Sequence, residues 1–336
     1  MTMPLVCVVI PCYNAEKYVG EAIRSALSQT YPNVEVIVID DGSTDGSLDV
    51  IRSFGGAIRW ESGPNRGGSA ARNRGVELAR GELIQFLDAD DLLYSRKLEV
   101  QVDAALRYRP AIPICDYETL YPNGYRYLND VSHPTNDPVV RVARHPFAVS
   151  VPLHWKELLL SVGGFRVGLP CWQEDDLHFR LACAGASFFH VPEVLFTWRR
   201  VPGSITDNWP RVVDYQRRIY LPLFKELKHA GALTDERALA LGAEVACYAY
   251  HYLHLGMTTK ARVTFRRARK MHPDAVRYGT ETMHHGRWLH LTGYRYLDPV
   301  CTFRIIKILS IPWRAGRAVQ RLLLRNRCGV KHTRCL

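Results

Sequence analysis

The sequence predicts an α/β fold built on a mainly parallel sheet and followed by a helical region. Over its first hundred residues, short apolar runs alternate with segments whose apolar residues recur at helical spacing, which is typical of βαβ units. After Asn208 the helical spacing continues without such runs. The composition, with 47% hydrophobic and 10% aromatic residues, is that of a globular protein and excludes a disordered or fibrous chain.

The elements of the parallel sheet follow one another in order. Apolar runs predict strands at Leu5–Ile10, Val34–Ile39, Ala57–Trp60 and Glu82–Leu87. Helices are predicted at Ala15–Ser28, from Ser43 or Thr44 to about Phe54, and at Gly68–Ala79. Polar clusters follow three of the strands, at residues 12–14, 40–43 and 88–91. Because ligands of open α/β sheets bind at the carboxyl ends of strands, we expect these clusters to share one crevice.

The second half of the chain has a different pattern. Residues 112–206 are irregular, with strand-like pieces, many prolines and one acidic helix at Glu174–Ala184. Helices are then predicted at Trp209–Ala230 and Thr234–Arg269.

Positive charge is concentrated at the end of the chain. The net charge of +11 arises from 44 basic and 33 acidic residues, and residues 287–336 hold eleven Lys or Arg but only one acid, Asp298. Beyond Pro312, arginines at 314, 317, 321 and 325 predict an amphipathic helix. Two interpretations are equally favoured: a helix lying on an anionic membrane surface, or a helix docked on the protein with its arginines in water. Nucleic-acid binding is not expected, because no recognised module is present.

The cysteines and the apolar segments indicate a cytoplasmic protein. The basic tail could also attach this protein to the inner face of the membrane. The nine cysteines are odd in number and contain no C-x-x-C, which favours a reducing compartment. The N-terminus lacks the basic start of a secretory signal, and no run of about 18 apolar residues predicts a spanning helix.

The strongest chemical signal is FLDADD at residues 86–91. Asp88 and Asp90 stand two residues apart directly after a buried strand, where a pair of carboxylates can hold a hard divalent cation against a diphosphate. The alternative for an isolated match is a solvated turn that caps the next helix. The polar ends of the two preceding strands favour the cation site.

Four segments in the same order resemble the signatures of the family-2 glycosyltransferases, which have the GT-A fold. These are VVIPCYN at residues 8–14, VIDDGSTD at 38–45, NRGG through AARNRG at 65–75, and GELIQFLDADD at 81–91. The resemblance covers about residues 4–206. It implies a Rossmann-like GT-A domain at 1–207, with a nucleotide-sugar-binding half at 1–111 and an acceptor half at 112–207. Residues 208–336 would then be a helical extension with a basic tail.

The resemblance also implies roles for single residues. Asp88 would contact the donor ribose or the metal, and Asp90 would bind the metal directly, as Mn²⁺ or Mg²⁺. The remaining residues implied to contact the donor are Pro11, Tyr13, Asn14, Asp41 and Ala89. Arg72 can neutralise donor phosphate, although on a helix with two more arginines it could equally be solvated surface.

A second acidic segment, QEDD at residues 173–176, follows GGF at 163–165 and resembles the family's E-D motif. Its carboxylate would remove the proton of the acceptor hydroxyl, which is a poor nucleophile until that happens. Asp175 is favoured as this base, with Glu174 as its rival. Trp172 and Asp176 are expected near the acceptor, although Asp176 also suits a helix N-terminus.

The closing segment, WRRVPGSIT at residues 198–206, departs from the family pattern, since Val201 stands where a histidine is usual. Arg199 or Arg200 could stabilise the leaving diphosphate instead. His178 and His190 are further candidates to replace the histidine.

Together these features predict an inverting enzyme that transfers a single sugar from a nucleotide-diphosphate donor, a UDP-sugar in preference, to a saccharide, lipid-linked or other hydroxyl acceptor. The Q-x-x-R-W signature of the processive relatives is absent. An oxidoreductase is disfavoured because PCYNAE replaces G-x-G-x-x-G after the first strand. The remaining alternative is a catalytically impaired binding or scaffold protein with the same fold.

Overall fold

The computed structural model describes residues 3–204 and 209–284, and the basic tail predicted beyond Pro312 lies outside them. The first sheet has the strand order β3-β2-β1-β4-β8. Its strands are β1 Val6–Cys12, β2 Val34–Asp40, β3 Arg59–Ser62, β4 Leu83–Phe86 and β8 Leu153–Trp155. The first four are parallel, and β8 runs antiparallel to β4. The predicted parallel sheet is thereby confirmed, and β8 is an addition that the sequence pattern did not predict.

Strand β1 is buried on both faces. Val6, Val8 and Ile10 belong to one hydrophobic cluster, whereas Cys7 and Val9 belong to a second cluster on the opposite face. Successive side chains of a strand point to opposite faces, so a strand covered on both sides must be apolar throughout. This is why the run from Leu5 to Ile10 is continuous rather than alternating.

Helices cover this sheet and a smaller one extends it. The helices of the first half are α1 Val19–Leu27, α2 Ser47–Arg52, α3 Gly68–Leu78 and α4 Lys97–Arg107, with a 3-10 turn at Gly55–Ala57. The second sheet has the order β5-β9-β6-β7, formed by Leu92–Leu93, Phe188–Arg199, Ile112–Leu120 and Arg126–Asn129. Between these strands lie α5 Pro138–Arg144, α6 Lys156–Ser161 and α7 Gln173–Cys183. The stretch that the sequence pattern left irregular thus contains most of an ordered second sheet, the helices α5 to α7, and strand β8 of the first sheet.

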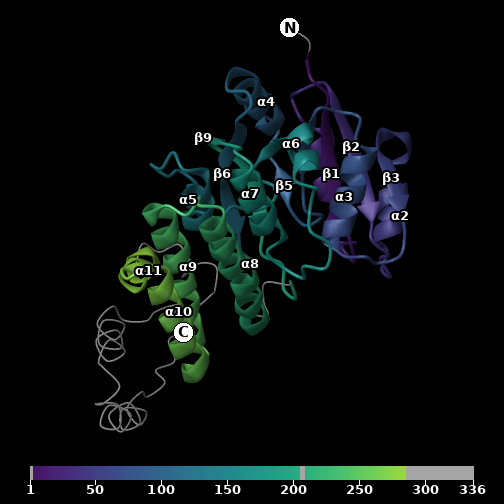
Figure 1. The fold of residues 1–336 in the computed structure, drawn as a ribbon. Helices are drawn as coiled ribbons and strands as arrows, with labels where there is room; N and C mark the ends of the chain where they lie inside the picture. The colour runs from purple at the N-terminus through teal and green to yellow at the C-terminus, as the bar shows by residue number, and fades with distance from the viewer. Residues whose placement is uncertain (1–2, 205–208, 285–336) are drawn as a thin grey trace, which may run out of the picture.

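Up to residue 284, where the described part of the chain ends, four helices follow and gather on one side of the molecule, beside α5 and α7 (Figure 1). They are α8 Trp209–His229, α9 Asp235–His254, α10 Thr258–Met271 and α11 Ala275–His284. The prediction of one continuous helix over Thr234–Arg269 is wrong, because the structure has two helices there, α9 and α10, separated by a turn. Gly256 lies at this break with φ of 72°, a left-handed conformation that ends a helix and favours glycine.

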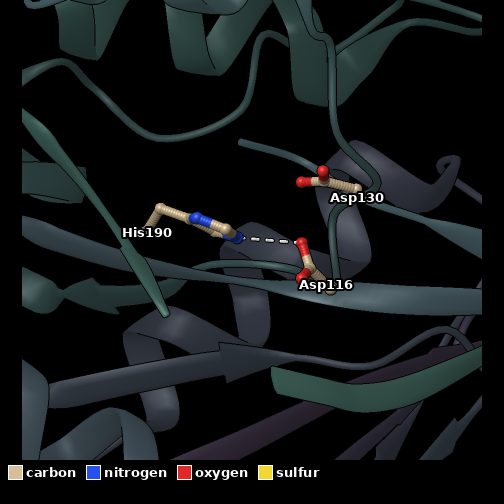
Figure 2. A group of neighbouring side chains, drawn as sticks. All are labelled: Asp116, Asp130 and His190. Carbon is tan, nitrogen blue, oxygen red and sulfur yellow. Dashed lines mark hydrogen bonds and ion pairs between the residues drawn. The ribbon is translucent and has the colours of Figure 1, made fainter. Parts of the chain in front are cut away.

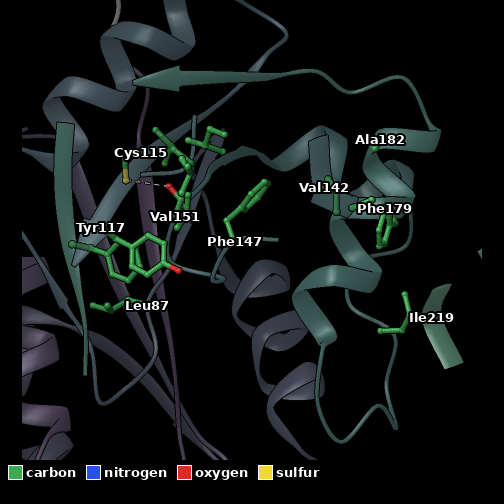
Figure 3. Packing of buried hydrophobic residues seen from close by; sticks show 14 of the residues in the cluster. Leu87, Cys115, Tyr117, Val142, Phe147, Val151, Phe179, Ala182 and Ile219 are labelled. Atoms are coloured by element: carbon green, nitrogen blue, oxygen red, sulfur yellow. Dashed lines mark hydrogen bonds between the residues drawn. The ribbon is translucent and has the colours of Figure 1, made fainter. Parts of the chain in front are cut away.

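The helical region shares a core with the sheets. One buried cluster contains Cys115 and Tyr117 of β6, Phe179 of α7 and Ile219 of α8 (Figure 3). Phe179 packs edge-on against Tyr220 with ring centroids 5.1 Å apart. The helices after residue 208 therefore support α7 rather than forming a separate core.

Candidate active site

The loops after β1 and β2 are tied together by side chains. Asn14 has φ of 49°, and its backbone N–H donates to Ser43 Oγ at 3.0 Å. Its side-chain Oδ1 accepts the N–H of Thr44 at 2.8 Å. Tyr13, one residue earlier, is left 52% exposed. The two loops thus form one wall, with an open aromatic face that could cover a base.

Asp41 orders the next turn. Its two carboxylate oxygens accept the backbone N–H groups of Arg66 at 2.7 Å and Gly67 at 2.8 Å. Gly67 has φ of 87° and precedes α3, so this acid sets where that helix begins. A carboxylate has about four acceptor positions, so these bonds leave Asp41 able to accept from a ligand. Pro11, also predicted to contact the donor, is half-buried in β1.

The D-x-D turn places its acids in three different environments. The Asp88 side chain is 36% exposed, Asp90 is half-buried, and Asp91 is buried and accepts the N–H of Arg199 at 2.9 Å. Burial and the neighbouring charge of Asp88 raise the pKa of Asp90 to about 6. Ala89 is also buried, so only its backbone can reach a ligand. Two adjacent carboxylates that repel each other fit a divalent cation.

Arg72 connects this turn to helix α7. Its guanidinium donates to Asp88 Oδ1 at 2.6 Å and to Gln173 Oε1 at 2.7 Å. The side chain is 11% exposed and lies 5.4 Å from the ring centroid of Phe165. Arg72 is therefore a buried bridge rather than solvated surface. No local pattern points to Gln173, since its role depends on this contact across 101 positions.

The acids at the start of α7 face different neighbours. Glu174 is half-buried, and burial raises the pKa of its carboxyl, with Arg72 opposing the rise and Asp88 adding to it. Asp175 is only 1% exposed, and burial followed by the charges of Glu174 and Glu244 holds its pKa well above the ordinary value. Glu174 thus lies in the electrostatic field of the D-x-D turn, whereas Asp175 faces the helical region.

Asp176 and Trp172 flank these acids. Asp176 accepts from Arg180 at 2.8 Å and from Arg166 at 3.1 Å, so its carboxylate is held in an ion-pair network. Trp172 precedes α7 with φ of 60°, a strained conformation for a bulky residue. Such strain clusters at functional sites, where surrounding packing enforces it.

The closing arginines lie against the D-x-D turn. Arg199 donates from Nε to the carbonyl of Asp90 and pairs with Glu21, and its guanidinium lies 5.1 Å from the ring centroid of Tyr18. Arg200 lies 5.3 Å from the ring centroid of Trp198. Arg199 thus supplies positive charge next to the acids of the D-x-D turn. In the family pattern, the histidine would stand two residues further along the chain, at position 201.

Neither candidate histidine replaces it. His178 is fully buried and stacks on His154 with centroids 5.7 Å apart. His190 pairs with Asp116 at 2.9 Å. It precedes Arg199 by nine residues on the same strand, so the two residues are roughly 30 Å apart along β9.

Comparison with known proteins identifies the family. The model of glycosyl transferase family 2 matches residues 7–146. An uncharacterized glycosyltransferase of Rickettsia typhi is 31% identical over 235 residues, which cover 67% of this chain and 73% of that protein. The chain belongs to glycosyltransferase family 2. A putative teichuronic acid biosynthesis glycosyltransferase of Bacillus subtilis is 34% identical over 127 residues, 36% of this chain and 50% of the relative.

Other relatives are longer than the part they share with this family-2 chain. An uncharacterized glycosyltransferase of Rickettsia felis is 35% identical over 191 residues. The match covers 53% of this chain but only 31% of the length of that relative. Within the described residues, none of the helices combines the length and apolar character needed to cross a membrane.

Solved structures confirm the GT-A fold. TarS 1-349 of S. aureus matches with a TM-score of 0.60 at 16% identity, over 87% of this glycosyltransferase and 93% of the 1-349 chain. Its complex with UDP-GlcNAc matches at 15% identity, 88% and 94% coverage and a TM-score of 0.55. A mannosyltransferase of Pyrobaculum calidifontis in complex with GDP-Man and Mn²⁺ matches at 19% identity, 85% and 89% coverage and a TM-score of 0.50.

Proposed function

We propose that this chain is an inverting glycosyltransferase that moves one sugar from a nucleotide-diphosphate donor to a hydroxyl acceptor. The observation that carries the proposal is the bridge from Asp88 through Arg72 to Gln173, next to Glu174. This bridge, together with the effect of the Asp88 charge on Glu174, supports a site shared by the donor-side acids and the candidate base. The UDP-GlcNAc bound by TarS supports a UDP-sugar as donor.

The donor side has the groups that a diphosphate requires. Asp88 and Asp90 would hold Mn²⁺ or Mg²⁺, and the Mn²⁺ in the mannosyltransferase complex supports this choice. When bound, such an ion neutralises charge on the leaving diphosphate. Arg72 and Arg199 add positive charge at the same turn. Tyr13 would cover the nucleobase of the donor, and the Asp41 carboxylate would accept a hydrogen bond from an N–H at the edge of that nucleobase.

Glu174 is the base that the geometry favours, in place of Asp175. A base must reach the proton of the acceptor hydroxyl, and Glu174 is partly exposed, whereas Asp175 is buried. Burial raises the pKa of the Glu174 carboxyl, which makes its carboxylate a stronger proton acceptor. Attack from the side opposite the diphosphate would invert the anomeric centre. Asp175 would then support the helix from behind.

The acceptor half and the tail complete the proposal. Residues 1–207 would form the catalytic domain, with 112–207 facing the acceptor beside Trp172 and Asp176. The acceptor would be a saccharide, a lipid-linked molecule or another alcohol. The basic tail would suit a lipid-linked acceptor by contact with an anionic membrane.

A nucleotide-sugar panel tests the function. The full chain is incubated with UDP- and GDP-sugars and Mn²⁺, and release of the nucleoside diphosphate is measured with and without mono- and oligosaccharide acceptors. We expect hydrolysis or transfer with one UDP-sugar. Donor binding without turnover by any sugar would instead support the impaired binding protein.

A further inference from the structure

Asp116, Asp130 and His190 bring three metal-ligating side chains together, and none of them is among the residues proposed to bind the donor or to act as the base (Figure 2). One ligand atom from each lies within 4.8 Å of the other two. Asp116 belongs to β6, His190 to β9, and Asp130 to the segment directly after β7. Three separate stretches of chain therefore converge on this cluster, which we call the D116 cluster.

The strand pairing explains why these side chains meet. Strands β6 and β9 are parallel, and their register shifts on both sides of Asp116. Such irregularities change the direction of a side chain. His190 Nε2 lies 2.9 Å from Asp116 Oδ1. The same oxygen accepts the N–H of Val131 at 2.8 Å, which holds the neighbouring Asp130 close to the strands.

Two of the three residues in the D116 cluster are largely buried, and the third is exposed. The side chains of Asp116 and His190 are 13% and 21% exposed, whereas Asp130 is exposed. Two ligands are therefore fixed on strands and partly protected from water. The third leaves a route by which an ion can enter.

We propose that the D116 cluster binds a divalent transition-metal ion, with zinc as the best match, at a site separate from the D-x-D motif. One imidazole nitrogen and two carboxylate oxygens form a mixed ligand set that suits zinc better than magnesium, which prefers oxygen alone. Zinc commonly takes three protein ligands and completes its shell with water. The ion would take the place of the direct contact between His190 Nε2 and Asp116 Oδ1, and both atoms would bind it instead.

The bound ion would strengthen the link between the second sheet and the helical region. The segment after Asp130 leads to Thr135, whose hydroxyl donates to Glu236 at 3.1 Å. Asp137 follows, caps α5 and pairs with Arg237 of α9 at 2.7 Å. Fixing Asp130 on the sheet would therefore restrain the start of this connection, and zinc would raise the thermal stability of the whole chain.

The test measures zinc binding in the full chain with Asp88→Asn and Asp90→Asn introduced, so that only ions outside the donor site are counted. Calorimetry and metal analysis after dialysis give the affinity and the number of bound ions. We expect one zinc ion, weaker binding of Mn²⁺ and none of Mg²⁺. His190→Ala and Asp130→Asn should each weaken zinc binding at least tenfold and abolish the zinc-dependent rise in melting temperature.

His229→Ala and Asp49→Asn are the matched controls, because both residues are exposed and distant in sequence from the cluster. Asp130→Asn protects the test against misfolding, since Asp130 lies outside the strands. Zinc binding that is absent from the parent, or that survives both cluster variants, overturns the proposal. The readout does not depend on sugar transfer, so this result and the result of the nucleotide-sugar panel are separate.

Discussion

The Arg72 guanidinium lies 2.6 Å from the Asp88 carboxylate and joins the D-x-D turn to the helix that carries the candidate base. Its second bond, to Gln173 at 2.7 Å, makes the contact geometrically specific. The flat guanidinium can serve two acceptors at fixed angles, which a lysine ammonium cannot do in the same way. One side chain thus links the D-x-D turn directly to the first residue of α7.

Arg72→Lys should lower kcat/KM for the donor by about 10–100-fold, because the charge remains while the bridge to Gln173 is lost. Steady-state kinetics with the identified nucleotide sugar measures this change. Arg74→Ala on the same helix is the control, since Arg74 pairs with Glu61 and Glu77 at the surface. An Arg72→Lys enzyme with unchanged kcat/KM would show that the bridge has no part in transfer.

Asp90→Ala should abolish the Mn²⁺-dependent part of donor binding, because one carboxylate alone is a poor site for a hard cation. Calorimetric titration of the nucleotide sugar with Mn²⁺ and with EDTA measures the difference. Asp91→Asn serves as the comparison, since the Asp91 carboxylate accepts from the Arg199 backbone. We expect that variant to lose stability and to keep metal-dependent binding. Equal Mn²⁺ dependence in wild type and Asp90→Ala would refute the metal assignment.

Glu174→Gln should reduce transfer by about 10²–10⁴-fold while donor affinity changes little, because it removes the proton acceptor and keeps the shape of the side chain. Asp175→Asn should reduce transfer less, since its side chain is buried away from the crevice. Single-turnover rates at saturating donor, together with donor binding, separate the two effects. The reverse order of the two losses would assign the base to Asp175.

Glu244→Gln should stabilise the protein in alkaline solution. Glu244 of α9 is fully buried, neither of its carboxylate oxygens has a hydrogen-bond partner within the described residues, and burial raises its pKa to about 8. A raised carboxyl pKa means that the folded state holds the proton more tightly than the unfolded state. Stability therefore falls, by about 1.4 kcal/mol per pH unit, as pH rises from the ordinary glutamate pKa toward 8.

Glutamine has no proton to lose at this position, so the variant should gain about 3–4 kcal/mol over wild type at pH 8 relative to pH 5. Urea unfolding at both pH values measures the difference. Glu226→Gln on α8 is the control because Glu226 is exposed. If the gap between wild type and Glu244→Gln is the same at both pH values, Glu244 is already ionised in the folded protein.

Gly75→Ala should destabilise the fold by about 1–3 kcal/mol, because a Cβ there would lie 2.2 Å from Val9 Cγ1 and would force α3 away from β1. Gly56→Ala, where an added Cβ meets no atom within 4 Å, is the comparison. Thermal unfolding measures both variants. Equal melting temperatures would mean that α3 moves aside without cost.

The sequence by itself determined the parallel sheet and the family. The apolar runs that form β1, β2 and β4 could be read directly, because a strand buried on both faces is mostly apolar rather than alternating. The same runs fixed the position of each polar turn, and hence the expectation that Asp41 and Asp88 lie at one edge. The sequence pattern predicts these strands well because both faces of each strand are covered, so nearly every residue of the strand is buried.

Only the tertiary structure decided which polar residue faces which neighbour. Glu174 and Asp175 are adjacent in sequence, but a helix turns about 100° per residue, so one faces Asp88 and the other Glu244. Likewise, β8 in the first sheet and the D116 cluster come from pairing between distant segments, which no local period records. The chemistry was visible in the types of residue, and its geometry depended on contacts between elements far apart in the chain.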